Sequence, residues 1–260
     1  MLSETDFLPS RPEAARRPEA PLAGQVAVVT GATSGIGNAI ARRLASEGAT
    51  LCALGRRQEA LDMLVRTVGA PGGKSFGYPL DLSVPEQIEE FASSFARECG
   101  QLDILVHSAG VIALGSMESS SVAQLDWHWN VNVRAPYALT RALLPMLKAR
   151  HGQIVFINSS AAGAATAVSG QYAASKHALG AIADSLRQEV NDDGIRVLNV
   201  FVGRTATPMQ AAVHASEQRA YLPEKLIQPD DVASVVAHTL GLPRTAEVTA
   251  IHMRPLAKPL

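Results

Sequence analysis

Two side chains four residues apart, Tyr172 and Lys176, have the types and the spacing needed for proton transfer. They stand at the start of a stretch with a helical pattern, 171–190, and residues at i and i+4 of a helix share one face. A phenol with a pKa of about 10 is a poor acid–base catalyst at neutral pH, but a neighbouring cation favours the phenolate. We therefore expect Tyr172 to act as a general acid or base and Lys176 to lower its pKa.

The same Tyr-x-x-x-Lys spacing occurs a second time, at Tyr221 and Lys225. That copy contains Pro223 and follows no predicted strand, so nothing in its context indicates a catalytic site. Tyr172 instead lies 13 residues after Ser159 and 12 after Ser160, and these two serines end a predicted strand. The first copy is therefore the candidate for chemistry.

A glycine-rich turn near the N-terminus has the spacing of a phosphate-binding loop. Gly31, Gly35 and Gly37 follow the apolar run 26–29 and precede a helical pattern. Gly31 permits a tight turn out of the strand, Gly35 permits close approach to a pyrophosphate, and Gly37 permits close packing of helix on strand. The positive end of the helix would then face the phosphates. This arrangement predicts a dinucleotide site.

The elements that position these residues alternate between strand and helix along the whole chain. Such alternation, with apolar runs that suit strands buried on both faces, predicts a single-domain, doubly wound parallel sheet (a Rossmann fold) with helices on both faces. Ligands bind such sheets outside the carboxyl ends of the strands. Strands are expected at 26–29, 50–54, 75–80, 102–106, 153–158, 195–202 and 247–253, and long helices at 122–148 and 171–190.

Composition narrows the class of protein further. The chain has 260 residues, 47% of them hydrophobic and 18% charged, with a net charge of −1. These values fit a soluble globular protein and favour neither a nucleic-acid partner nor a membrane. The two cysteines and the scattered histidines lack disulfide or metal spacing, which predicts a cytoplasmic location and no metal. Residues 1–24, rich in proline and charge, are expected to form a disordered leader before a domain at 25–260.

Taken together, the motifs resemble those of the short-chain dehydrogenase/reductase family. The resemblance extends over about residues 24–253, and the order and spacing of its motifs are highly specific. The matching positions are the glycine loop at 30–37, Asp81-Leu82, Ala109-Gly110, Asn132, the serine pair 159–160 and the Tyr172/Lys176 motif.

This resemblance implies a role for each catalytic candidate. Tyr172 would be the general acid in carbonyl reduction and the base in alcohol oxidation, and Lys176 would also hold the nicotinamide ribose. Asn132 would anchor a water molecule in a proton relay. A serine would bind the substrate oxygen: Ser160 fits the residues that follow it, whereas Ser159 has the more usual spacing to Tyr172. We favour Ser160 and keep Ser159 as the alternative.

The resemblance also implies the residues that would bind the cofactor. Two positions depart from the family pattern without removing a functional group: His107, expected to replace an asparagine structurally, and Val202, which stands where proline is usual. Thr207 is expected to reach the carboxamide. The expected cofactor-binding residues are Gly31, Thr33, Ser34, Gly35, Ile36, Gly37, Arg56, Asp81, Leu82, Ala109, Gly110, Tyr172, Lys176, Gly203, Thr205 and Thr207.

The end of the second predicted strand favours NADP(H) over NAD(H). A carboxylate there would bind the ribose 2′-hydroxyl of NAD and repel a 2′-phosphate. This chain instead has Gly55, followed by Arg56 and Arg57. An arginine can bind phosphate through two parallel hydrogen bonds, and we assign that role to Arg56.

The expected activity is therefore NADP(H)-dependent interconversion of a small-molecule carbonyl and a secondary alcohol. A hydroxy-acid or serine-type dehydrogenase is an alternative, because Arg204 and Arg219 lie in the predicted substrate lid, 204–227, and either could bind a carboxylate. A non-catalytic dinucleotide-binding module is the alternative from another class. Family resemblance and small residues along 171–190 favour a homo-oligomer, most simply a tetramer.

Overall fold

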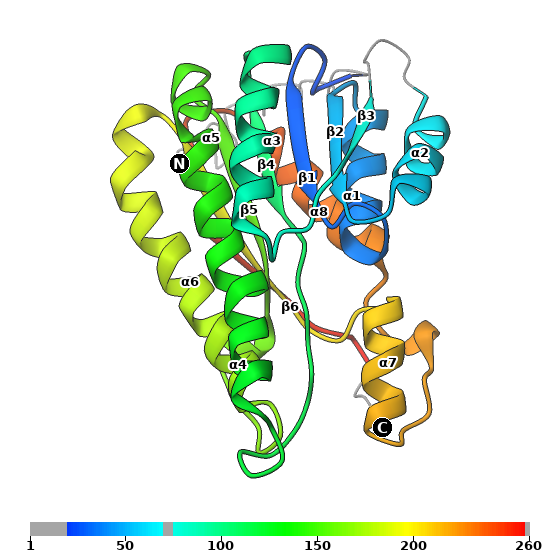
Figure 1. Ribbon diagram of the computed structural model, residues 1–260. Helices are drawn as coiled ribbons and strands as arrows, with labels where there is room; N and C mark the ends of the chain where they lie inside the picture. The colour runs from blue at the N-terminus through cyan, green and yellow to red at the C-terminus, as the bar shows by residue number, and fades with distance from the viewer. Residues whose placement is uncertain (1–19, 70–74, 258–260) are drawn as a thin grey trace, which may run out of the picture.

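A computed structural model describes residues 20–69 and 75–257 and shows the predicted doubly wound sheet (Figure 1). Seven strands pair in the order β3-β2-β1-β4-β5-β6-β7, and every neighbouring pair is parallel. The order reverses between β1 and β4, which is where such sheets bind ligands. The strands are β1 (Val26–Thr30), β2 (Thr50–Gly55), β3 (Phe76–Pro79), β4 (Ile104–His107), β5 (Gln153–Ser159), β6 (Arg196–Val202) and β7 (Ala250–Met253).

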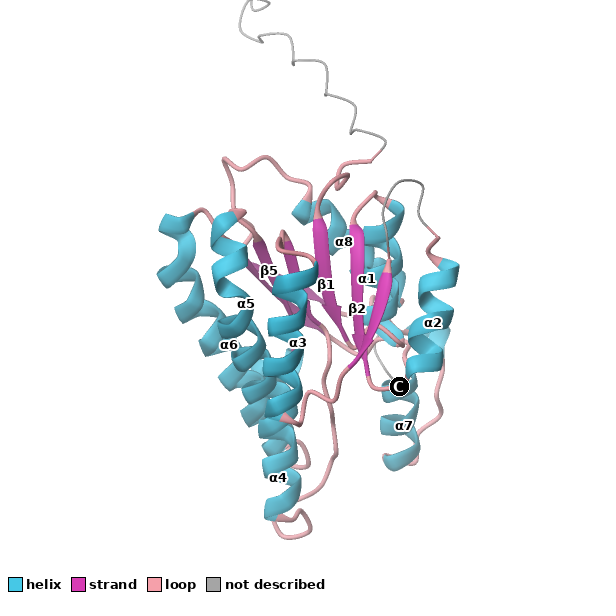
Figure 2. Cartoon of the chain, turned by 45° about the horizontal axis from the view of Figure 1, so that its top comes forward, coloured by secondary structure: helices cyan, strands magenta, loops and turns pink. Residues whose placement is uncertain are grey.

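Helices cover both faces of the sheet, as Figure 2 shows. One face packs against α1, α2 and α8, and the other against α3, α5 and α6. The helices are α1 (Gly35–Ser46), α2 (Gln58–Thr67), α3 (Pro85–Glu98), α4 (Val122–Trp129), α5 (Ala135–Ala149), α6 (Gly170–Val190), α7 (Pro208–Ser216) and α8 (Pro229–Leu240). None of the helices in the described ranges combines the length and the apolar character that crossing a membrane requires.

The two cores explain why the central strands are continuous apolar runs. Successive side chains of a strand point to opposite faces, so Val28 packs into one core and Val29 into the other. All five residues of β1 are buried. Burial on both faces holds the sheet rigid, and the loops at the carboxyl ends of the strands are positioned by it.

Folded structure is present before the predicted domain boundary at residue 25. Residues 1–19 lie outside the described part, but residues 20–24 form a turn in which Leu22 is fully buried. The Leu22 amide donates to the carbonyl of Glu47, 3.0 Å away, at the end of α1. This corrects the expectation of disorder for residues 20–24, because an apolar side chain among charged and proline residues caps the core there.

The long helix predicted at 122–148 is interrupted by one wider turn. α4 passes into a π-helical turn, Asn130–Arg134, and then into α5. A π-turn carries one residue more than an α-turn, and such turns are frequent at functional sites. It places Asn132, 1% exposed, inside the protein beneath the end of β4.

The predicted lid, 204–227, contains a short helix that its sequence pattern did not reveal. α7 has only nine residues, of which Val213 and His214 are buried, too few for a visible period. Thr207 caps α7 by accepting a hydrogen bond from Gln210 N, 3.1 Å away. The two ends of the lid pair with each other: Ala206 N donates to Ile227 O at 2.8 Å, and Ile227 N to Arg204 O at 3.2 Å.

Candidate active site

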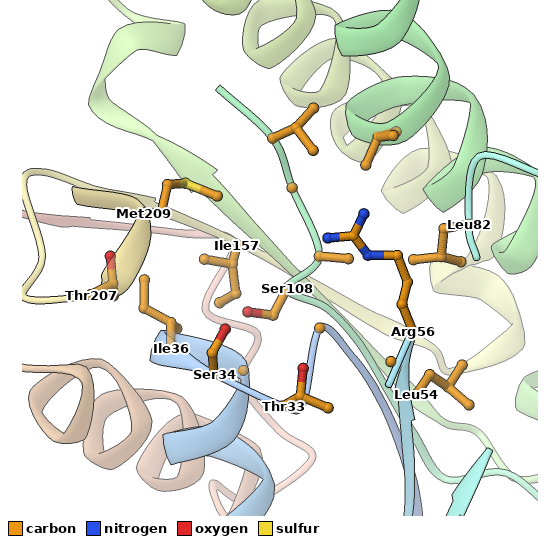
Figure 3. A pocket seen from close by; sticks show the side chains of 18 of the residues that line it. Thr33, Ser34, Ile36, Leu54, Arg56, Leu82, Ser108, Ile157, Thr207 and Met209 are labelled. Atoms are coloured by element: carbon orange, nitrogen blue, oxygen red, sulfur yellow. The ribbon is translucent and has the colours of Figure 1, made fainter. Parts of the chain in front are cut away.

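A cavity of about 410 Å³ lies at the carboxyl ends of the strands and brings together most of the predicted site residues. Figure 3 shows Arg56 reaching into it, with Thr33 and Ser34 on one side and Thr207 and Met209 at another. The predicted residues that line it are Gly31, Thr33, Ser34, Gly35, Ile36, Gly37, Arg56, Asp81, Leu82, Ala109, Gly110, Tyr172, Lys176 and Thr207.

The glycine loop presses the start of α1 against the end of β1. A Cβ on Gly37 would overlap the carbonyl oxygen of Gly31 and come within 3.1 Å of Ser108 Oγ. Gly31 has a φ of 65° and lies against the Ala109 backbone, where a Cβ would be 2.9 Å from Cα. Only glycine allows this packing.

The first-turn amides of α1 form the floor of the cavity. Ser34 precedes the helix without capping it through its side chain. Among the described residues, no acceptor outside the helix pairs with the amides of Gly35, Ile36 or Gly37. Free amides at a helix N-terminus are suited to phosphate oxygens. The residues present thus fit the pyrophosphate of a dinucleotide.

Thr30 joins the first strand of the site to the fourth. Its Oγ1 accepts hydrogen bonds from the amides of Ser108 and Ala109, each 3.0 Å away, and donates to Val106 O at 3.3 Å. The two loops that form the walls of the cavity are therefore held at a fixed separation.

Arg56 and Asp81 border the cavity at the ends of β2 and β3. The exposed Arg56 guanidinium makes no hydrogen bond or ion pair within the described part of the chain, and it points into the cavity (Figure 3). The Ser83 backbone amide and hydroxyl, 2.9 and 2.7 Å from Asp81 Oδ1, hold the pKa of Asp81 below its usual range. Burial opposes this shift, and nearby Arg56 adds to it. Asp81 is thus an anion, and its Oδ1 already accepts two hydrogen bonds from Ser83.

Tyr172 and Lys176 meet on one face of α6 at the cavity wall, where burial dominates both pKa values. Burial raises the pKa of Tyr172, and a hydrogen bond from Ser159 opposes this. Burial also lowers the pKa of Lys176 from 10.5 to about 8. The sequence suggested that Lys176 would lower the pKa of Tyr172; the net shift has the opposite sign, because removing the phenol from water disfavours its charged form. Tyr172 therefore holds its proton at neutral pH.

The structure places Ser159, rather than Ser160, beside Tyr172. Ser159, the last residue of β5, accepts a bond from Ala161 N at 3.1 Å, and its hydroxyl lies close enough to Tyr172 to act on the pKa of the phenol. Ser160 begins a 3₁₀ turn, Ser160–Ala162, and is exposed.

Lys176 is buried, and within the described part of the chain its ammonium group makes one hydrogen bond, to Ile157 O at 3.2 Å. We expect Lys176→Met to raise the free energy of unfolding at pH 7 by about 1–3 kcal/mol, because the lowered pKa means that the folded state disfavours the proton. Between pH 8 and 10.5 the folded wild type loses this proton while the unfolded chain keeps it, so wild-type stability rises and the gap narrows. Denaturant unfolding at pH 7 and 9.5 measures both effects.

Lys225→Met is the matched control, since Lys225 is exposed and belongs to the second Tyr-x-x-x-Lys copy. Its stability should stay within about 0.5 kcal/mol of the wild type at both pH values. A Lys176→Met protein no more stable than wild type at pH 7 would contradict the prediction.

Asn132 uses its side-chain amide to hold the loop after β4. Its Oδ1 accepts from Val111 N at 2.8 Å, and its Nδ2 donates to Val111 O and to Ser175 Oγ, each at 3.0 Å. Both amide hydrogens are therefore committed to the protein. The side chain therefore positions the loop, while Oδ1 accepts from the described residues only one of the two hydrogen bonds it can take.

Two predicted cofactor residues lie outside the cavity lining. Gly203 donates its amide to Met253 O at 2.8 Å and packs against Pro255. Thr205 is 4% exposed and turns its hydroxyl back onto Gly203 O, 3.0 Å away. Both residues lie at the base of the lid. Thr205 pairs with Ile227 at the other end of the lid, and Gly203 is bonded to Met253 at the end of β7.

Sequence reasoning missed several apolar residues of the cavity, chiefly Trp127 and Met209. Trp127 is 41% exposed and Met209 43%, and their positions on α4 and α7 become apparent only when the helices are placed. His107 fits its structural interpretation: it is buried, contacts Thr140 Oγ1 at 2.7 Å and stacks on Phe156. Burial lowers the pKa of His107 to about 3, so it is neutral.

Both arginines proposed to bind a carboxylate are engaged within the lid. Arg204 makes two hydrogen bonds of 2.7 Å to the carboxylate of Glu217, and Arg219 lies 3.9 Å from the same group. The Arg204 bonds hold the pKa of Glu217 below its usual range. Neither arginine lines the cavity.

Comparisons with known proteins agree with this geometry. The chain is 33% identical over 248 residues to glycine betaine reductase ATRR of Emericella nidulans, covering 94% of this chain but only 20% of that protein. It is 33% identical to 2,3-dihydro-2,3-dihydroxybenzoate dehydrogenase of Bacillus subtilis, covering 82% of this chain and 87% of the relative. A crystal structure of a metagenomic short-chain oxidoreductase in complex with NADP is 33% identical, with a TM-score of 0.78 over 91% of this chain and all of that one.

The family model for short chain dehydrogenases matches residues 25–218, which contain the glycine loop, the serine pair and the Tyr172/Lys176 motif. The sheet order, the cavity and these relatives lead to the same assignment. The chain belongs to the short-chain dehydrogenase/reductase family of oxidoreductases.

Proposed function

We propose that the protein is an NADP(H)-dependent oxidoreductase that interconverts an uncharged carbonyl compound and a secondary alcohol. The observation that carries the proposal is the placement of Tyr172 and Lys176 on the wall of one cavity with the glycine loop, with Ser159 beside the phenol. One cavity thus holds a proton donor and a place for a dinucleotide.

In this proposal the bound cofactor supplies the hydride, and the protein supplies orientation and a proton. Tyr172, protonated at neutral pH, gives its proton to the oxygen of the reduced carbonyl. The Ser159 hydroxyl, which accepts from Ala161 N, keeps its own hydrogen for the Tyr172 oxygen or the substrate oxygen. A protonated Lys176 stabilises the phenolate left behind and is positioned to bind a ribose hydroxyl. Alcohol oxidation uses the same groups in reverse.

The direct test follows the absorbance of reduced cofactor during incubation with a panel of carbonyl compounds. We expect NADPH oxidation with uncharged ketones or aldehydes. Turnover restricted to keto acids would favour the hydroxy-acid alternative, which the pairing of Arg204 with Glu217 argues against. Tight cofactor binding without turnover of any compound would favour the non-catalytic module.

We propose that Arg56 gives the protein its preference for NADP(H), as supported by its free guanidinium and by the NADP complex of the metagenomic relative. Arg56→Ala should weaken NADPH binding about 10- to 100-fold, the contribution of a charge-assisted hydrogen bond, and leave NADH binding nearly unchanged. Arg57→Ala is the matched control, because Arg57 is exposed and does not line the cavity. Fluorescence titration measures both affinities; equal binding of the two cofactors by the wild type would contradict the proposal.

Conversion towards NAD(H) requires more than an acidic side chain at position 55. A Cβ on Gly55 would be 2.7 Å from Thr33 Cγ2. Gly55→Asp should therefore be combined with Thr33→Ser as well as Arg56→Ala. We expect the triple variant to favour NADH, whereas Gly55→Asp with Arg56→Ala alone should bind both cofactors weakly.

We also propose that the protein forms a homotetramer through α4, α5 and α6. Large apolar side chains are exposed on α4 and α5, among them Leu125 (43%), Trp129 (48%) and Tyr137 (56%). On α6, Ala174 and Ala181 are exposed and small enough for close helix approach. Sedimentation equilibrium at micromolar concentration should show the tetramer, and a monomer across that range would contradict it.

We propose a cytoplasmic location and a single catalytic domain over residues 25–260. Both cysteines are free: Cys52 is buried, and burial raises its pKa, while Cys99 is half-buried. Unpaired thiols of this kind are typical of a reducing compartment.

A further inference from the structure

The segment of residues 111–115, which leaves β4, crosses the active site in an extended form held at every second residue. It runs between α4 and α7 in both views (Figures 1 and 2). Asn132 holds Val111 through two hydrogen bonds, and the Gly115 amide donates to Val168 O at 2.8 Å. Between these points the Ala113 amide donates to His128 Nε2 at 2.9 Å. His128 is thus the central attachment of this segment.

The hydrogen bonds of His128 determine its protonation. A backbone amide only donates, so Nε2 must be the unprotonated acceptor. The other ring nitrogen, Nδ1, lies 2.7 Å from Gln124 O and therefore carries the hydrogen. With both nitrogens committed in a neutral ring, His128 has none left for a metal or for proton transfer to substrate.

The same ring also packs against the proposed acid. His128 is 0% exposed, and its ring meets that of Tyr172 edge-on, with centroids 6.1 Å apart and planes inclined by 63°. Burial lowers the pKa of His128, and the bond to Gln124 O opposes this shift. His128 therefore touches both the 111–115 segment and Tyr172.

We propose that His128 is a positioning residue for the proposed carbonyl reduction: it holds residues 111–115 and the Tyr172 ring in a fixed relation. This inference rests on the proposed function. An apolar residue of similar size would fill the space and contact Tyr172, but it would leave the part-buried Ala113 amide without an acceptor. A histidine supplies a ring and an acceptor at once.

The test compares His128→Phe with His128→Gln in the full chain. His128→Phe keeps a ring and removes the acceptor, so hydrogen exchange in a peptide spanning 111–116 should accelerate at least about tenfold and kcat/KM for the carbonyl should fall about 10- to 100-fold. The Kd for NADPH should stay within about twofold, because the His128 side chain does not line the cavity. Gln Oε1 can take the position of Nε2, so His128→Gln should restore both the protection and most of kcat/KM.

Ala113→Pro examines the same bond from the other side by removing the donor, and it decides the question if His128→Phe does not fold. It should lower kcat/KM by a similar factor. Three results would each overturn the inference alone. The first is unchanged hydrogen exchange in a folded His128→Phe protein, and the second is faster exchange with unchanged kcat/KM. The third is an Ala113→Pro protein as active as wild type. A wild type that reduces no carbonyl refutes the proposed function, and the inference with it.

Discussion

Replacing Tyr172 with phenylalanine is expected to preserve cofactor binding and to lower kcat about 100- to 10,000-fold, the usual contribution of general acid–base catalysis. The change removes one oxygen from a half-buried ring that remains in contact with His128. Ser159 keeps its bond from Ala161 N, so the strand end should not move. Stopped-flow or steady-state oxidation of NADPH measures the loss, and fluorescence titration measures the retained affinity.

Tyr221→Phe provides the matched control, because it makes the same change in the other Tyr-x-x-x-Lys copy. Tyr221 packs edge-on against His214 and does not line the cavity. Its removal should change kcat by less than about threefold, as expected of a substitution away from the site. If the Tyr172→Phe protein reduces carbonyls at near-normal rates, another group donates the proton.

Replacing Gly37 with alanine is expected to abolish tight cofactor binding. The added Cβ would overlap Gly31 O and approach Ser108 Oγ, and the first of these is backbone that a side-chain rotation cannot move. The start of α1 would have to shift away from β1, displacing the first-turn amides that face the cavity. Losing two charge-assisted hydrogen bonds to phosphate would weaken binding at least about 100-fold. Overpacking should also reduce stability by about 1–3 kcal/mol.

Gly69→Ala is the control for this experiment. The nearest atom to its added Cβ would be Arg66 O at 3.6 Å, an ordinary contact, so neither affinity nor stability should change appreciably. Isothermal titration with NADPH and thermal unfolding measure the two quantities. A Gly37→Ala protein that binds NADPH as tightly as wild type would show that the helix terminus does not hold the phosphates.

The fold followed from the sequence because burial on both faces makes each central strand a continuous apolar run. β1, β4 and β5 could be recognised for this reason, and their alternation with amphipathic helices predicted the parallel sheet. The π-turn at Asn130–Arg134 could not be recognised, because one additional residue in a turn leaves no mark on a helical pattern. α7 was missed since a helix with two buried residues has no measurable period.

The candidate site was predictable where a residue acts through its own type and spacing, as the three glycines and Tyr172 do. It was not predictable where three-dimensional placement decides, as for Ser159 against Ser160 or for Trp127 on the cavity wall. His128 illustrates the limit most clearly. Its acceptor role depends on an amide 15 residues away, and no local pattern connects the two.

The pairing of the two lid ends has a consequence for how substrate range can diverge. The Arg204 carbonyl and the Ala206 amide are hydrogen-bonded to Ile227. The 20 or so residues between them therefore form a loop whose two ends are held together. Lengthening such a loop adds little to the entropic cost of closing it, and each doubling of the loop length costs only about 0.6 kcal/mol of folding free energy. Whole lids can therefore be exchanged between related chains while the strands beneath keep their register. The cavity roof can therefore change independently of the glycine loop and of the Tyr172/Lys176 pair.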